Sequence, residues 1–132
     1  MTVINAKNTK PLVYADKTIA RAERALICSP FQVNLFETMR QESVPINAIA
    51  QAAGIENNYT HSTLSELAAE NYLLWLIQVG VLRREVDGQG ITDSFRLTPL
   101  GSQLIEQQSK WRNPTWRDRL LNAAIRYLRL PF

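Results

Sequence analysis

LIQVGVLRREVDGQGITDSFRLTPLG, residues 76–101 of a 132-residue chain, is the stretch that decides the fold. Two runs of β-forming residues, 81–86 and 91–97, bracket the turn sequence DGQG at 87–90. An Asp-Gly pair between two such runs is a strong signal for a β-hairpin, and one of the two turn glycines is expected at a positive φ. Thr98-Pro99 then supplies an N-cap and a first-turn proline. The stretch therefore predicts a hairpin that separates two helices.

Upstream of the hairpin, helical patterns alternate with helix breakers. Ser29-Pro30 predicts the start of a helix, because serine caps a first turn and proline is tolerated within it. Gly54 is the expected C-terminal stop of a short helix, and Thr63 with Glu66 fits a capping box at the start of a long one. Helices are predicted over about 16–28, with Asp16 as N-cap, and over about 30–42, 46–53 and 62–79.

The two chain ends differ from this central part. Residues 1–13 are polar and contain Pro11, which favours an extended arm. Asn113-Pro114 repeats the cap-and-proline pattern ahead of an amphipathic segment. We therefore expect an N-terminal arm at 1–13, a domain with a leading helix at 14–109, and a C-terminal amphipathic helix at 110–132 that serves dimerisation.

The composition excludes several classes of protein. Apolar residues make up 45% of the chain, which supports a packed core rather than disorder. A single cysteine, Cys28, excludes an internal disulfide, and the single histidine, His61, has no partner at metal-ligand spacing. We expect no enzyme activity, no catalytic residue, no metal and no cofactor. We find neither an apolar run of membrane-spanning length nor a secretory signal, and expect a cytoplasmic protein.

Charge is unevenly distributed along the chain. The net charge is +3, yet residues 41–82 contain four glutamates and no lysine or arginine. Residues 110–132 contain six basic residues and one acidic residue. The basic ends either lie beside an anionic partner or form ordinary solvated surface.

Three motifs in order suggest a family. INAIAQAAGI at 46–55 looks like the first half of a helix-turn-helix, LIQVGVL at 76–82 like the end of a recognition helix, and FRLTPLG at 95–101 like a returning wing strand. Together they resemble the winged helix-turn-helix superfamily, in particular MarR-like and PadR-like regulators, and also the winged dimerisation domains of plant-type O-methyltransferases. The resemblance implies a mostly α fold with a small β-hairpin wing and additional N- and C-terminal helices.

The resemblance also implies a DNA-binding transcriptional regulator that acts as a homodimer on duplex DNA. Arg84 and Arg96, on paired strands, are expected close together, where they either lie along a phosphate backbone or serve only the solubility of the strand edge. Short polar side chains near the start of the long helix are candidates for base-edge contact. The candidate nucleic-acid-binding residues are Asn58, His61, Thr63, Arg83, Arg84 and Arg96.

The C-terminal helix carries an apolar face too wide for a lone surface helix. A basic amphipathic helix with tryptophan can bind a membrane surface, but such helices usually have a wider charged face. We therefore favour packing against a second subunit over a membrane. The candidate dimer-interface residues are Ile19, Leu26, Trp116, Leu120, Ala124, Tyr127 and Leu128.

A second hypothesis is a winged-helix module for protein–protein contact or assembly that does not bind DNA. Its basis is the absence of lysine and arginine from 41–82, the range that includes the long helix. In DNA-binding proteins of this kind, the recognition helix normally carries Arg, Lys, Asn or Gln side chains that contact the DNA. Salt dependence separates the hypotheses, because DNA binding weakens steeply with salt and an apolar protein contact does not.

Overall fold

The computed structural model describes residues 14–107 and 116–128. Over these residues the protein is mostly helical with a small antiparallel sheet, as the sequence predicted. The expected arm at 1–13 and the Asn113-Pro114 cap lie outside the described residues. The elements are α1 (Asp16–Ile27), α2 (Val33–Gln41), β1 (Val44–Pro45), the 3-10 helix η2 (Ile46–Ala48), α3 (Gln51–Glu56), α4 (Glu66–Gln78), β2 (Leu82–Asp87), β3 (Gly90–Leu97), α5 (Pro99–Glu106) and α6 (Trp116–Leu128).

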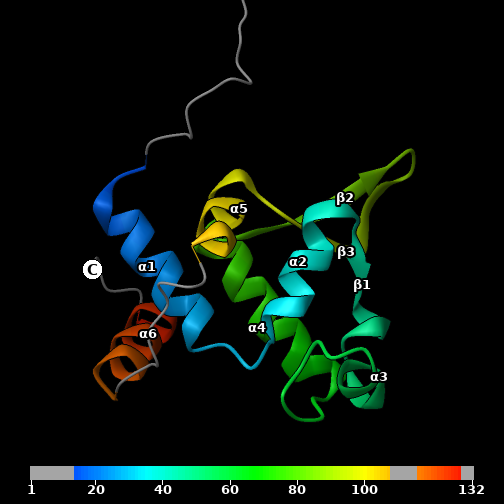
Figure 1. Cartoon of the computed structure of the whole chain (residues 1–132), viewed down its shortest axis with the longest axis horizontal. Helices are drawn as coiled ribbons and strands as arrows, with labels where there is room; N and C mark the ends of the chain where they lie inside the picture. Colours follow the sequence, from blue (N-terminus) through cyan, green and yellow to red (C-terminus); the bar gives the residue numbers. More distant parts are fainter. Residues whose placement is uncertain (1–13, 108–115, 129–132) are drawn as a thin grey trace, which may run out of the picture.

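The predicted hairpin is confirmed. Strands β2 and β3 pair antiparallel, with Leu82 opposite Leu97 and Val86 opposite Ile91. Gly90 has a φ of 120°, a backbone conformation that glycine adopts without the steric penalty of a Cβ. Figure 1 shows the hairpin projecting at one end of the molecule, while α1 and α6 lie at the opposite end.

A third strand, β1, was not predicted from the sequence. Val44 lies opposite Phe95 and Pro45 opposite Ser94, so the strand order is β1-β3-β2. Val44-Pro45 falls in the gap between the helices predicted over 30–42 and 46–53, where the sequence indicated a helix break and no strand. Proline lacks an N–H donor, but it is compatible with an edge strand, which is where this short segment lies.

Two predicted N-caps, Ser29 and Asp16, are wrong. The second helix begins at Val33 rather than Pro30, because Phe31 forms an isolated antiparallel bridge with Thr60. The hydroxyl of Ser29 does not cap a following helix but donates to the carbonyl of Leu26, at 2.8 Å. Helix α1 does begin at Asp16, although its N-cap residue is Ala15, without a side-chain cap.

The predicted helix over 46–53 is also wrong. In place of one helix, the structure has a 3-10 helix at Ile46–Ala48 and a separate helix α3 that starts at Gln51. The φ of Gln51 is 61°. Gly54 lies inside α3 and does not end it. A Cβ at this position would lie 2.1 Å from the carbonyl oxygen of Ile49, so glycine permits a close approach between backbone segments.

Helix α4 begins later than predicted. Its N-cap is Ser65, whose hydroxyl accepts from the backbone N–H of Ala68 at 3.0 Å, so the proposed capping box at Thr63 does not form. Downstream, the Thr98-Pro99 start of α5 is confirmed, since Thr98 accepts from the N–H of Gly101 at 3.0 Å.

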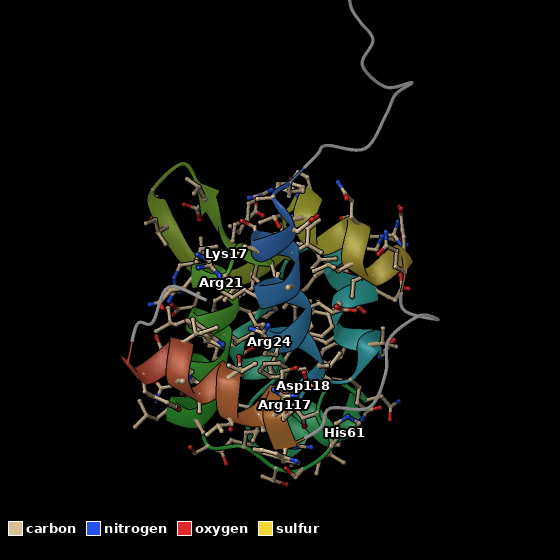
Figure 2. The ribbon with its side chains drawn as sticks, turned by 90° about the vertical axis from the view of Figure 1, so that its left-hand side faces the viewer. Lys17, Arg21, Arg24, His61, Arg117 and Asp118 are labelled. Carbon is tan, nitrogen blue, oxygen red and sulfur yellow. The ribbon has the colours of Figure 1, made fainter. Side chains whose placement is uncertain are left out.

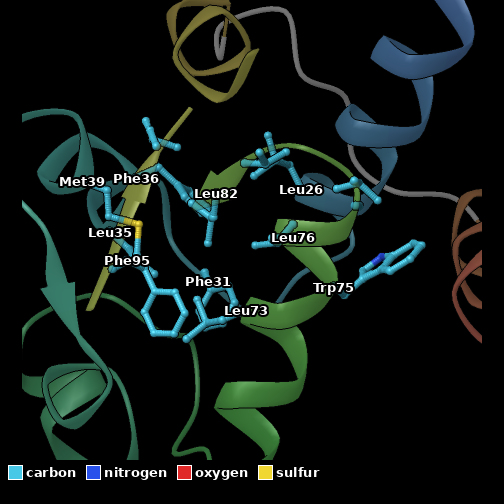
Figure 3. Close-up of a cluster of buried hydrophobic side chains, with 14 of the residues drawn as sticks. Leu26, Phe31, Leu35, Phe36, Met39, Leu73, Trp75, Leu76, Leu82 and Phe95 are labelled. Carbon is cyan, nitrogen blue, oxygen red and sulfur yellow. The ribbon is translucent and has the colours of Figure 1, made fainter. Parts of the chain in front are cut away.

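The core lies between α1, α2, α4, α5 and the sheet. Phe31 contacts the rings of Phe36 and Tyr72 edge-on, at centroid distances of 6.2 and 6.3 Å. In Figure 3, Trp75 points away from the other labelled side chains of this cluster, towards α6. Its indole N–H donates to Oδ1 of Asn122 at 2.9 Å, which ties α6 to α4. The largest fully buried side chains include Phe36, Phe95, Leu35, Met39, Ile49, Leu73 and Leu76.

Candidate functional site

Arg84 links the hairpin to helix α4. Its guanidinium lies 5.0 Å from the centroid of the Phe95 ring. One terminal nitrogen is 3.7 Å from a carboxylate oxygen of Glu70 on α4, and the other is 3.8 Å from one of Asp93 on β3. The positive charge of Arg84 therefore faces two carboxylates of its own chain.

Arg96 does not lie beside Arg84, contrary to the expectation from the paired strands. The register places Arg96 opposite Arg83 and places Arg84 opposite Phe95. Side chains alternate along a strand, so Arg84 points to one face of the sheet, whereas Arg83 and its partner Arg96 point to the other. Arg96 lies 3.8 Å from a carboxylate oxygen of Glu85 and donates to the carbonyl of Gln41 at 3.4 Å.

A pocket of about 70 Å³ lies between α4 and the hairpin. Three of its side chains are carboxylates and one is the guanidinium of Arg84. The surrounding segment is acidic as well, because residues 33–106 contain nine Asp or Glu and four Arg. The net charge of residues 33–106 is therefore negative, which is unfavourable for binding a phosphate. The pocket is lined by Ile46, Glu66, Glu70, Arg84, Asp93 and Phe95.

The three candidates for base contact lie outside helix α4. Asn58, His61 and Thr63 are exposed in the loop between α3 and α4. Asn58 has a φ of 62°, and its carbonyl accepts from the side chain of Asn34 at 3.4 Å. The backbone N–H of His61 donates to the carbonyl of Pro30 at 3.1 Å. These residues thus belong to a loop anchored against the start of α2.

Exposed apolar side chains on α4 and the hairpin were missed by the sequence analysis. Leu67, in the first turn of α4, is 68% exposed. Val86 and Ile91, paired near the hairpin tip, are 60% and 74% exposed. The sequence shows that these residues are apolar, but it does not show how far α4 and the hairpin extend beyond the core. Their exposure could therefore not be predicted.

The opposite end of the molecule is basic. Lys17, Arg21 and Arg24 follow one side of α1, and Figure 2 shows them on the same face as Arg117 and the buried Asp118 of α6. Beside them, α6 exposes Trp116, Leu120 and Tyr127 on its outer side.

The candidate dimer-interface residues divide into three groups. Trp116, Leu120 and Tyr127 are exposed, whereas Ile19 and Ala124 are partly buried. Leu26 is 3% exposed and belongs to the core of the subunit, so it does not contribute to a surface between subunits. The side chain of Leu128 lies outside the described part of the chain.

A metal centre is not formed by the residues that the structure describes. Among them, no group of three or more His, Cys, Asp or Glu side chains is arranged to hold an ion. Cys28, the single cysteine of the chain, is half-buried at the end of α1 and forms no disulfide within the chain. Within residues 14–107 and 116–128, no helix has the length and apolar character needed to cross a membrane.

Comparison with known proteins identifies a family. Residues 12–126, which include every described helix and strand except the last two residues of α6, match the Npun_F0494-like family. No curated protein and no solved structure matches the chain. Since the matched region covers most of the chain, including the Glu70–Arg84 contact between α4 and the hairpin, this protein belongs to the Npun_F0494-like family.

Proposed function

We propose that this chain is a winged-helix module for protein–protein contact, and that helix α4 and the hairpin form the contact face. The order α2, β1, α3, α4, β2, β3, with the three strands in one small sheet, supports the winged-helix assignment. In this arrangement α4 takes the place of a recognition helix and the hairpin that of a wing.

The observation that carries the proposal is the position of Arg84 between Glu70 and Asp93. A wing arginine that binds a phosphate needs its guanidinium free to face the DNA. Here a phosphate would have to displace two carboxylates and would then lie beside both of them. Like charges at such a distance disfavour the complex, so this face is better suited to an uncharged or basic protein surface.

The exposed apolar residues supply contact area for such a partner. Leu67 lies in the first turn of α4, and Val86 and Ile91 lie opposite each other near the hairpin tip, with side chains that are 60–74% exposed. Full burial of an aliphatic side chain contributes about 1.5–3 kcal/mol. A few buried apolar anchors surrounded by polar contacts is the usual composition of a protein interface.

A DNA-binding transcriptional regulator is the second candidate, favoured by the exposure of Arg83. Among the described residues, no carboxylate forms an ion pair with this side chain. Arg83 lies on the outer sheet face beside Arg96 and could contact a phosphate there. This function requires the outer face of the hairpin, rather than the face that carries Arg84, to meet the DNA.

A titration of a labelled random duplex, followed by anisotropy at two salt concentrations, separates the candidates. A protein-contact module shows no saturable binding below ~10 μM at low salt, the range of ordinary non-specific DNA binding. A regulator binds, and Arg83→Ala weakens its binding to all duplexes and lowers the salt slope by about one unit. Saturable binding that depends on Arg83 would overturn the first proposal.

The protein-contact proposal also has a direct test by photo-crosslinking in cells of the source organism. A photoreactive residue at position 67 is expected to crosslink to one protein species, and Ile91→Glu should abolish that product. The matched control places the same residue at Ala20, an exposed position on α1 at the opposite end of the molecule. Equal crosslinking from both positions would show that the contact is not made by the α4–hairpin face.

A homodimer remains part of the proposal. The outer side of α6 exposes Trp116, Leu120 and Tyr127, and large exposed apolar side chains on one helix side are typical of interaction sites. We propose that two copies pack through this side of α6, which leaves the α4–hairpin face of each copy free.

A further inference from the structure

A groove of about 310 Å³ runs between α4 and α6. Its floor is one stripe of α4, because its four α4 residues follow one another at intervals of three, one and three positions. The hydrogen bond from the indole of Trp75 to Asn122 joins its two walls. The lining residues are Asn71, Leu74, Trp75, Gln78, Arg126 and Tyr127.

Arg126 is the charged residue of this groove. Its guanidinium lies 4.8 Å from the ring centroid of Tyr72 and 5.0 Å from that of Tyr127. One terminal nitrogen donates to the backbone carbonyl of Asn71 at 3.1 Å. Two aromatic rings and one carbonyl thus hold the guanidinium in place, so it loses little conformational freedom when it binds a ligand.

The charge of Arg126 is not neutralised within the described parts of the chain. No carboxylate among residues 14–107 and 116–128 forms an ion pair with it. Arg40, Arg84 and Arg96, in contrast, each lie within 3.8 Å of a carboxylate oxygen. The remaining N–H groups of Arg126 are therefore available to an anion from outside the chain.

We propose that the α4–α6 groove binds a small organic anion with a carboxylate at one end and a flat apolar body. The carboxylate accepts hydrogen bonds from Arg126. The apolar body packs against Leu74, Trp75 and the ring of Tyr127. The side-chain amides of Asn71 and Gln78 lie at the rim, where they select for polar substituents.

The volume of the groove limits the ligand. Ligand sites usually enclose about 300–1,000 Å³, so this groove admits a compound of one or two rings. A compound of this size in an open groove binds with a Kd on the order of 0.1 mM. Because the ligand contacts both helices, its binding stabilises the docked position of α6. The site is separate from the α4–hairpin face and does not depend on the protein-contact proposal, although it shares Tyr127 with the proposed dimer face of α6.

Phenylacetate and 2-naphthoate are suitable probes, and phenylacetamide is the matched neutral control. The readout is the indole N–H signal of Trp75 in a ¹⁵N–¹H NMR spectrum of the full chain, assigned with Trp75→Phe. We expect a saturable shift with both anions and an affinity at least tenfold lower for the amide, because only the anions form a charge-assisted contact with Arg126.

Variants separate this site from general anion binding. Arg126→Gln should lower the affinity for phenylacetate about tenfold, whereas Arg119→Gln, an exposed position on the same helix, should leave it unchanged. Leu74→Trp fills the groove and should abolish binding although Arg126 is still present. This second variant tests the site even if Arg126→Gln disturbs the docking of α6. The proposal is overturned if neither anion shifts the Trp75 signal at several millimolar, if the amide binds as tightly, or if Leu74→Trp leaves binding intact.

Discussion

The carboxylate of Glu70 on α4 lies 3.7 Å from the guanidinium of Arg84 on β2. This contact joins the helix and the strand that a winged-helix protein would turn towards its partner. The side chain of Arg84 is 22% exposed and that of Glu70 is 44% exposed, so solvent screens their attraction and the contact adds little stability. Under the protein-contact proposal its larger effect is on recognition, because the carboxylate of Glu70 offsets the positive charge of Arg84 on this face.

We predict that removing the two carboxylates beside Arg84 converts this face into a weak polyanion-binding surface. Glu70→Gln combined with Asp93→Asn should raise the affinity for random duplex several-fold at low salt, because the guanidinium becomes available to phosphate. Adding Arg84→Ala to that double variant should reverse the gain. Anisotropy at low and moderate salt measures both effects, and an unchanged affinity in the double variant would show that Arg84 cannot reach DNA.

Gly54 is predicted to be essential for stability. An added Cβ would lie 2.1 Å from the carbonyl oxygen of Ile49 and 2.7 Å from the hydroxyl of Thr60, and the first of these belongs to backbone that cannot rotate away. Gly54→Ala should lower the free energy of unfolding by about 3 kcal/mol or more. Gly88→Ala is the control, since no atom lies within 4 Å of its added Cβ. Equal urea midpoints for the two variants would contradict this prediction.

The capped starts of α4 and α5 should differ in their contribution to stability. The hydroxyl of Thr98 accepts from the N–H of Gly101 and also lies within hydrogen-bonding distance of the carbonyls of Gly80 and Val81. Ser65 makes a single capping bond, to the N–H of Ala68, at an exposed position. Thr98→Ala should therefore cost about 2 kcal/mol and Ser65→Ala about 0.5–1 kcal/mol. Chemical denaturation of both variants gives the order, and a larger loss at Ser65 would refute it.

The proposed dimer should dissociate when the outer side of α6 is made charged. Leu120→Glu places a carboxylate in the centre of the exposed apolar stripe, where a second copy would bury it unpaired. Light scattering at ~100 μM should show a dimer for the unmodified protein and a monomer for the variant. Ser62→Glu, at an exposed position in the loop before α4, should remain dimeric. An unmodified protein that is monomeric at this concentration would exclude the dimer.

Some of the candidate site could be predicted from the sequence. The hairpin position and the presence of Arg83, Arg84 and Arg96 on it follow from strand periodicity and the turn residues. The partners of Arg84 do not, because Glu70 is fourteen positions earlier in the chain and meets it only when α4 packs against the sheet. The groove around Arg126 was also missed, since it forms only when α6 docks on α4.

The sequence by itself determined the elements whose signals are local. Asp87 to Gly90 form a turn because their own backbone preferences favour one, and Thr98-Pro99 start a helix because capping acts within one turn. Tertiary structure decided the rest. Phe31 leaves the helical pattern to pair with Thr60, and Val44 forms a strand against Phe95, because backbone hydrogen bonds from distant segments satisfy groups that the local chain leaves unpaired. Such pairings depend on which distant segments the core brings together, and a local pattern of residues does not determine this.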